Sequence, residues 1–289
     1  MDKVLELKQK YDIGEITEYE ESIEYFEKSE LIKELLSDFD LTTLNLLNRL
    51  AELSEIPFTA ELDKVKFWIN KLADLSYCGD GFSLTGKSDD ILACYNSMIT
   101  TILIKLNYGN SNQIQKGIDW ILRFQNFERG VPNNWNGSGV LKYGGCMKLT
   151  PCFIGVVKAL ITLTECKKSK NYKSNALLEK KLKKGLEYVL EHNLFKRKTN
   201  DKPITKDITK LTYPFFYKTN LIEILRLIKD NNLLSDVRCN SAIEFLDKKK
   251  NKDGFWKVNS VYLPKNWVEF DKPKKNGLWL TYEINKLID

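Results

Sequence analysis

Two cysteines, Cys146 and Cys152, lie close together in the chain and could take part in thiol or metal chemistry. A structural zinc site needs about four ligands at short spacings, and a thiol nucleophile commonly needs a neighbouring imidazole. Cys94 and an aspartate could act as further ligands only if the fold brings them close to the two thiols. Cys146 and Cys152 are therefore the best-placed thiols for catalysis, but we expect buried cysteines and no cofactor, with zinc as the weaker alternative.

The only histidine of the chain, His192, follows the apolar residues at the end of a predicted helix. The C-terminal end of a helix stabilises a protonated imidazole through the helix dipole. We predict a capping or surface role for His192 rather than a catalytic one.

Asp89 and Asp90 are the best-placed pair of carboxylates. They follow Ser88 and come just before a long apolar segment. Serine and aspartate at the start of a helix accept hydrogen bonds from free backbone amides, and their charge complements the helix dipole. A helix cap is the simplest interpretation of this pair.

A repeated pair of helices must position these side chains. Each unit has an amphipathic helix with an aromatic residue, a glycine-containing turn, and then a helix that is apolar nearly all round. The aromatic residues of the leading helices are Trp68, Trp120, Tyr188 and Phe245, and trailing helices are predicted at 91–106, 152–163 and 278–288. The polar segment 196–212 is predicted to be a loop within the third unit, either functional or mobile. The period predicts either a closed ring, with the leading helices outside, or a stacked solenoid.

Some of these units resemble the repeat of the terpene cyclase and prenyltransferase superfamily. The residues that carry the resemblance are Gly117-Ile118-Asp119-Trp120-Ile121-Leu122-Arg123-Phe124-Gln125 and 242–246, running on to Asp253-Gly254-Phe255-Trp256. Residues 143–289 are similar, more narrowly, to prokaryotic squalene cyclase-like proteins of unknown activity, on the segments 143–146, 152–160, 190–197, 213–217 and 279–281. The resemblance covers about residues 60–289. It implies an all-α fold, the alpha/alpha toroid, as one domain with N-terminal helices in 1–57 and four helical hairpins in 58–289.

The same resemblance suggests a role for the carboxylates. Class II terpene cyclases carry an Asp-x-Asp-Asp motif whose middle aspartate protonates the substrate, and Asp89 would take that place, with Asp90 as its neighbour. Lys87 replaces the first aspartate and Ile91 the usual threonine. A lysine favours the ionised form of a nearby carboxyl, whereas a general acid must hold its proton until it reacts. Thr150 stands where the related group often has a histidine, so a thiol–imidazole pair is also missing.

Aromatic and basic residues gather ahead of the trailing helices. The aromatic residues are Trp135, Tyr143, Tyr213, Phe215, Phe216, Tyr217, Trp267 and Trp279, and the lysines are Lys87, Lys148, Lys210 and Lys275. The aromatic rings could line a cavity for a hydrophobic chain or a cation, or they could pack hairpin against hairpin. If the trailing helices run parallel, their N-termini and these lysines gather at one end of the cavity. They would then form a positive mouth, which would receive an anionic head group.

The composition narrows the class of protein. The chain has 289 residues, 43% of them hydrophobic and 29% charged, with a net charge of +6. The basic stretches have no aromatic–basic platform or zinc-finger spacing, so we expect solvated lysine faces and no nucleic-acid partner. No apolar run approaches the roughly 18 residues of a membrane span. The charged first residues predict no secretory signal, and hence a cytoplasmic protein.

Together these patterns suggest a toroid enzyme, similar to terpene cyclases and prenyltransferases, that acts on a small hydrophobic substrate in a central cavity. The substrate could be isoprenoid or have an anionic head. The alternative is a non-catalytic ligand-binding or scaffold protein with a degenerate cyclase motif. A thiol or metal site built on the cysteines is the third hypothesis.

Overall fold

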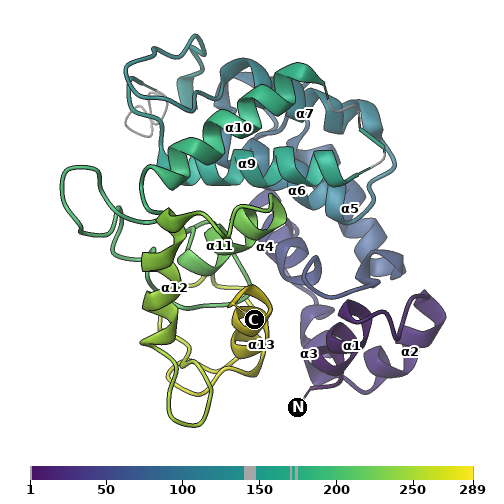
Figure 1. The fold of residues 1–289 in the computed structure, drawn as a ribbon. Helices are drawn as coiled ribbons and strands as arrows, with labels where there is room; N and C mark the ends of the chain where they lie inside the picture. The colour runs from purple at the N-terminus through teal and green to yellow at the C-terminus, as the bar shows by residue number, and fades with distance from the viewer. Residues whose placement is uncertain (1, 140–147, 170, 173–174, 289) are drawn as a thin grey trace.

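The computed structural model describes residues 2–139, 148–169, 171–172 and 175–288. Within these residues there are twelve α-helices and no strand, which confirms the all-α prediction. The helices, labelled in Figure 1, are α1 (Lys3–Asp12), α2 (Tyr19–Glu27), α3 (Glu30–Leu35), α4 (Thr43–Leu53), α5 (Asp63–Ser76), α6 (Ala93–Lys105), α7 (Ser111–Phe124), α9 (Phe153–Lys168), α10 (Ala176–Leu190), α11 (Leu221–Asp230), α12 (Asn240–Asp247) and α13 (Leu278–Ile288). None of the described helices is long and apolar enough to cross a membrane.

Along the chain, helices with one buried face alternate with helices that are buried nearly all round. α7 and α10 bury one stripe and leave lysine, arginine, aspartate and glutamate exposed. α6 and α9, by contrast, are buried on almost every side and pack against each other. The predicted trailing helices at 91–106, 152–163 and 278–288 correspond to α6, α9 and α13. The segment 196–212 contains no helix, as expected, and joins α10 towards α11.

Asparagine starts three of these helices. Asn110, Asn175 and Asn220 precede α7, α10 and α11, and each accepts a hydrogen bond from the backbone amide three residues later. This contact satisfies one of the free amides at a helix start, which makes asparagine one of the preferred residues there.

Close helix packing depends on a glycine that precedes the aromatic residue by three positions. Gly185 of α10, three residues before Tyr188, faces α9. A Cβ atom at this position would lie 2.4 Å from Leu160 Cδ2 and 2.6 Å from Phe127 Cδ1. Gly117 of α7 makes the equivalent approach to α6, where a Cβ atom would lie 2.3 Å from Thr100 Oγ1. The missing side chain therefore sets the distance between the two helices.

Replacing Gly185 by alanine should lower the free energy of unfolding by up to about 2 kcal/mol. The new methyl group overpacks the contact with Leu160, which costs about 1–3 kcal/mol. The gain in helix propensity of about 1 kcal/mol offsets part of this cost. Urea denaturation would measure the change. The exposed Lys183→Ala variant of the same helix is the control, and a Gly185→Ala protein more stable than that control would contradict the packing argument.

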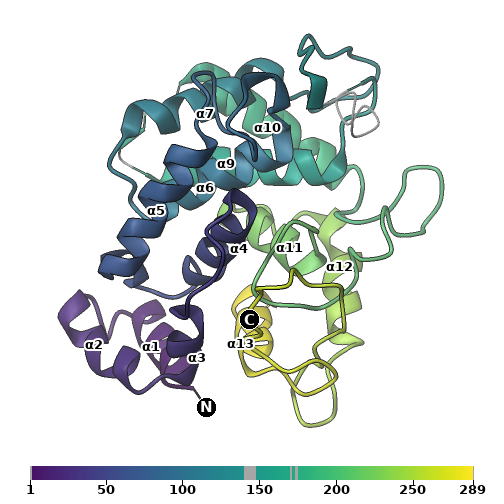
Figure 2. The ribbon, with the colours of Figure 1, turned by 180° about the vertical axis from the view of Figure 1, so that it is seen from behind.

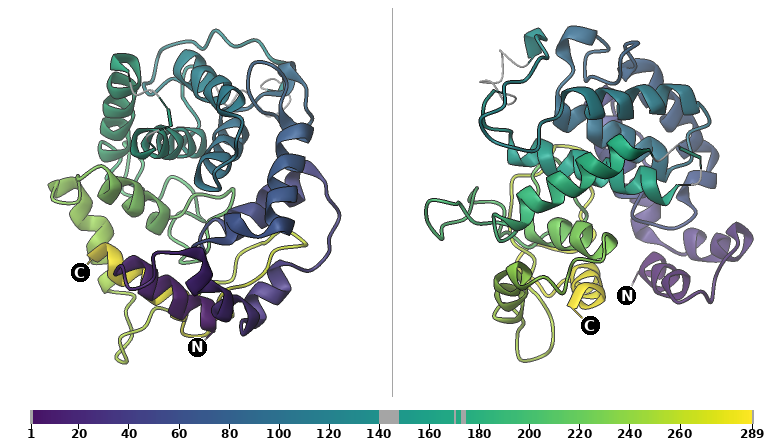
Figure 3. Two further views of the ribbon diagram at one scale, coloured as in Figure 1. Left: turned by 90° about the vertical axis from the view of Figure 1, so that its right-hand side faces the viewer. Right: turned by 45° about the horizontal axis from the view of Figure 1, so that its top comes forward.

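The two ends of the chain meet through polar contacts. Asp12 in α1 accepts hydrogen bonds from Tyr282 Oη at 2.8 Å and from Lys286 Nζ at 2.6 Å, both in α13. In α4, Arg49 Nη2 donates to Asn266 O at 2.9 Å, and Glu52 Oε1 accepts from the Val268 amide. Figures 2 and 3 show the result, with the purple N-terminal helices beside the yellow C-terminal segment. The chain thus curves round until its ends are in contact.

Candidate functional site

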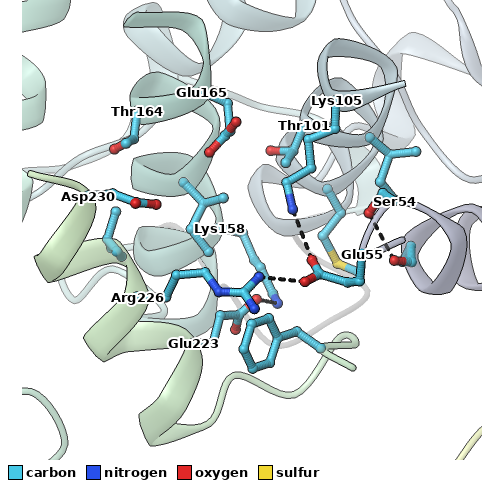
Figure 4. Close-up of a pocket in the computed structure, with 16 residues that line it drawn as sticks. Ser54, Glu55, Thr101, Lys105, Lys158, Thr164, Glu165, Glu223, Arg226 and Asp230 are labelled. Carbon is cyan, nitrogen blue, oxygen red and sulfur yellow. Dashed lines mark hydrogen bonds and ion pairs between the residues drawn. The ribbon is translucent and has the colours of Figure 1, made fainter. Parts of the chain in front are cut away.

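A cavity of ≈ 80 Å³ lies between four helices, α4, α6, α9 and α11 (Figure 4). Each of α6, α9 and α11 contributes one helical face, because its lining residues recur at intervals of three, four and seven positions. The lining residues are Ala51, Ser54 and Glu55 at the end of α4, Met98, Thr101, Ile102 and Lys105 of α6, Lys158, Ile161, Thr164 and Glu165 of α9, Glu223, Arg226, Leu227 and Asp230 of α11, and Phe215.

This central cavity opens into a larger vestibule of ≈ 1060 Å³. The residues that line both spaces are Ser54, Glu55, Lys105, Glu165, Arg226 and Asp230. Most of them lie in the last turn of their helix or just beyond it. The C-terminal ends of the four helices therefore meet at the opening between the two spaces, which is the mouth of the central cavity. Helix C-termini carry partial negative charge and favour a cation nearby. The mouth is therefore suited to a positively charged or hydrogen-bond-donating group.

Glu55 is the centre of a buried ionic network at this mouth. Its carboxylate accepts hydrogen bonds from Lys105 Nζ at 2.9 Å, Tyr213 Oη at 2.8 Å and Arg226 Nη1 at 2.5 Å. Arg226 also donates to Glu283 at 2.5 Å, and its guanidinium lies 4.5 Å from the centre of the Phe215 ring. Burial alone would raise the pKa of Glu55, but Arg226 and Lys105 outweigh it and hold the pKa well below its ordinary value.

The floor of the cavity is a second buried ion pair, between α9 and α11. Lys158 Nζ lies 2.5 Å from Glu223 Oε1 and donates to the Phe216 carbonyl at 2.8 Å. The side chain of Lys158 is 5% exposed and that of Glu223 is 7% exposed. The second oxygen, Glu223 Oε2, has no hydrogen-bond partner in the described part of the chain. A buried acceptor left unpaired costs about 1–3 kcal/mol, so this atom calls for an explanation.

Apolar side chains also line the cavity. They are Met98 and Ile102 of α6, Ile161 of α9 and Leu227 of α11. The site thus combines an apolar wall with a carboxylate oxygen that can still accept a hydrogen bond.

The carboxylates singled out in the sequence lie outside this cavity. Asp89 and Asp90 belong to a 3-10 turn, Ser88–Asp90, ahead of α6. Asp89 is exposed and accepts a hydrogen bond from Ser138 Oγ at 2.8 Å, and Asp90 accepts one from Thr85 Oγ1 at 2.7 Å. The prediction that the pair caps the helix is wrong, because α6 begins at Ala93 with Leu92 at its N-cap position and no side-chain cap.

The thiols form no metal cluster that the structure describes. Cys146 and Tyr143 lie outside the described residues. Cys152 precedes α9 and is half-buried, and Cys94 Sγ lies 4.0 Å from Tyr217 Oη. Burial raises the pKa of Cys94 to about 11, so its thiol is protonated at neutral pH and is a poor nucleophile. Among the described residues no three metal-binding side chains converge.

The basic residues ahead of the trailing helices do not gather at either cavity. Lys87, Lys148 and Lys275 are exposed and Lys210 is half-buried, and none of them lines the central cavity or the vestibule. The predicted positive mouth therefore does not coincide with the opening between the central cavity and the vestibule, which lies at the opposite, C-terminal ends of the helices.

The aromatic residues pack mainly against one another. Trp135 packs against Trp120 and Phe124, and its Nε1 donates to the Ile91 carbonyl. The other close ring pairs are Tyr213 with Trp279 at 5.9 Å, Phe216 with Trp267 at 5.5 Å and Tyr217 with Tyr95 at 5.1 Å. Among the predicted substrate-binding residues, Tyr213 joins the central site, through its hydroxyl contact with Glu55.

Apart from Tyr213 and Phe215, the residues that form the site were not singled out from the sequence. Lys158 and Glu223 lie in helices whose other buried positions are mostly apolar. A charged residue in the buried part of such a helix was the available signal, because charges are almost never fully buried unless they are paired. Comparison with protein-family models, with curated proteins and with solved structures finds no match to this chain.

Proposed function

We propose that the chain is a helical toroid that binds a small amphipathic molecule in its central cavity, which corresponds to the non-catalytic alternative suggested by the sequence. The alternation of half-exposed and fully covered helices supports an outer and an inner ring. The contacts between α1 and α13, and between α4 and residues 266–268, support closure of that ring.

One observation carries the proposal: a buried carboxylate oxygen without a partner, Glu223 Oε2, belongs to a residue that lines the cavity. A ligand that donates a hydrogen bond would satisfy it, and an ammonium group would do so most strongly because it would also pair with the carboxylate charge. Met98, Ile161 and Leu227 would hold an alkyl chain, and each buried methylene contributes about 0.8 kcal/mol. We therefore propose an alkylamine-type ligand.

A cyclase-like activity has less support. The carboxylates that would supply the proton, Asp89 and Asp90, are hydrogen-bonded to neighbouring side chains outside the cavity, and Asp89 is exposed. A general acid for an alkene needs contact with the substrate and shelter from water.

Ligand-observed NMR with n-butylamine, n-butanol and butyrate would test the proposal. These three probes share an alkyl chain and differ in the head group. We expect the amine to bind best, the alcohol more weakly and the carboxylate not at all, because butyrate would place a second negative charge beside Glu223.

A cavity-filling variant links the binding to the site. Ile161→Trp should abolish the saturation transfer to butylamine, because the indole ring occupies the cavity. Ile154→Trp changes the same residue type in the same helix, at another half-buried position that does not line the cavity, and should bind as the native protein does. Equal binding of butylamine to both variants would place the site elsewhere and reject the proposal.

A further inference from the structure

A separate cavity of ≈ 300 Å³ lies where the end of α10 meets the start of α9. Its walls include the rings of Phe153, Tyr188 and His192, together with Arg129, Arg197 and Lys198. These are three cationic side chains, and the described lining contains no carboxylate. The cavity shares no lining residue with the central site or its vestibule.

The imidazole of His192 is buried in this wall, contrary to the surface role expected from the sequence. The residue is 3% exposed, and its ring is held beside Tyr188 and Phe153, with ring centres 5.0 Å and 5.6 Å away. Nδ1 lies 2.7 Å from the Lys196 carbonyl oxygen. Because a carbonyl can only accept, Nδ1 carries a proton and donates it to this bond.

The other ring nitrogen, Nε2, is buried and has no hydrogen-bond partner among the described residues. In the neutral ring it is an acceptor that lacks a donor, and in the protonated ring it would be a donor that lacks an acceptor. A partner that can exchange a proton with Nε2 would satisfy it in either state.

The surrounding charges favour an anion as that partner. Burial lowers the pKa of His192, and Arg129 and Lys198 lower it further, although the Lys196 carbonyl and Glu191 act in the opposite direction. Lys198 is paired with Glu191, whereas Arg129 and Arg197 form no ion pair with a carboxylate in the described part of the chain. An anion placed among these groups would offset their charge and favour protonation of the imidazole.

We propose that this cavity binds a phosphate group, with His192 Nε2 sharing one proton with a phosphate oxygen and the cationic side chains balancing the charge. The neighbouring Phe153 and Tyr188 rings provide an apolar surface for the organic part of a phosphate monoester. With a phosphate monoester, neutral His192 accepts a hydrogen bond from the P–O–H of the singly ionised group. Protonated His192 donates one to the doubly ionised group, so the two forms hold the same number of protons.

Because the chain has a single histidine, its imidazole signals in NMR report on this site without ambiguity. The test uses the full chain in inorganic phosphate, in sulfate and in sodium chloride of equal ionic strength. We expect phosphate to shift the His192 signals in a saturable way and to raise the pKa of His192 by about one unit, which corresponds to tenfold tighter phosphate binding to the protonated form. Sodium chloride should do neither.

A comparison at pH 8 isolates the shared proton. The imidazole is then neutral, hydrogen phosphate still offers a P–O–H donor and sulfate offers none. Phosphate should therefore bind at least tenfold more tightly than sulfate, and equal binding would overturn the assignment. An unchanged His192 signal in phosphate would overturn the site itself.

Two variants check the charge contribution. Arg129→Ala removes a cation of the cavity and should weaken phosphate binding about tenfold. Lys206→Ala removes an exposed lysine of the nearby loop that does not line the cavity, and should leave binding unchanged. Equal loss in both variants would mean a non-specific effect of net charge and would contradict the proposal.

Discussion

Replacing Glu55 by alanine is expected to lower the free energy of unfolding by about 3–5 kcal/mol, as for the loss of one partner from a buried ion pair. The change leaves Arg226 with Glu283 alone, Lys105 without its carboxylate, and the Tyr213 hydroxyl without an acceptor. Urea denaturation at neutral pH would measure the loss. The exposed Glu20→Ala variant is the control and should stay close to the native protein.

The Glu55 carboxylate also makes a predictable contribution to acid stability. Its pKa is lower in the folded chain than in the unfolded chain, so its stabilising effect is complete above the unfolded pKa of about 4.5. That contribution is lost as the pH falls through the folded value. The difference in stability between the native protein and Glu55→Ala should therefore shrink below about pH 4.5, and a constant difference down to pH 2 would contradict the ionised network.

Replacing Lys158 by methionine is expected to be equally damaging, at about 3–5 kcal/mol, because it leaves the buried Glu223 carboxylate without its cation. Glu223 Oε1 would then lack a partner, as Oε2 already does. The double variant Lys158→Met with Glu223→Leu should recover most of the lost stability, since an apolar pair of similar volume often replaces a buried ion pair without cost.

The single variant Lys158→Met and the double variant with Glu223→Leu together distinguish an effect on stability from an effect on ligand binding. The double variant should fold but fail to bind butylamine, because its cavity no longer has a carboxylate at the floor. A Lys158→Met protein as stable as the native one would show that the pair is not buried as described. A double variant that retains amine binding would show that Glu223 is not the ligand's partner.

The helical framework could be predicted from the sequence because its signals are local. The aromatic residues Trp120 and Tyr188 sit on one-sided apolar stripes, and the covered helices α6 and α9 lack a continuous polar face. The first helix, α1, falls within the N-terminal helices predicted for 1–57, but its own bounds were not predicted. Its apolar positions Val4, Leu5 and Leu7 are few, and their burial depends on contacts made by the rest of the chain.

The site was harder to predict because it is assembled from distant parts of the chain. Glu55, Lys105, Tyr213 and Arg226 come from separate segments, and no spacing in the sequence relates them. The resemblance to cyclases favoured Asp89, and the lysines ahead of the covered helices favoured their N-terminal ends. The cavity opens instead at their C-terminal ends, and only the arrangement of the helices determines which end is open.

The central claim is that the cavity between α4, α6, α9 and α11 holds a small amphipathic molecule. Native mass spectrometry of the full chain, purified from the cells in which it naturally occurs, tests this claim most directly. We predict a small retained mass on the native protein and on Ile154→Trp, released by adding excess butylamine and absent from Ile161→Trp. A native protein without any retained mass, or a mass that Ile161→Trp keeps, would contradict it.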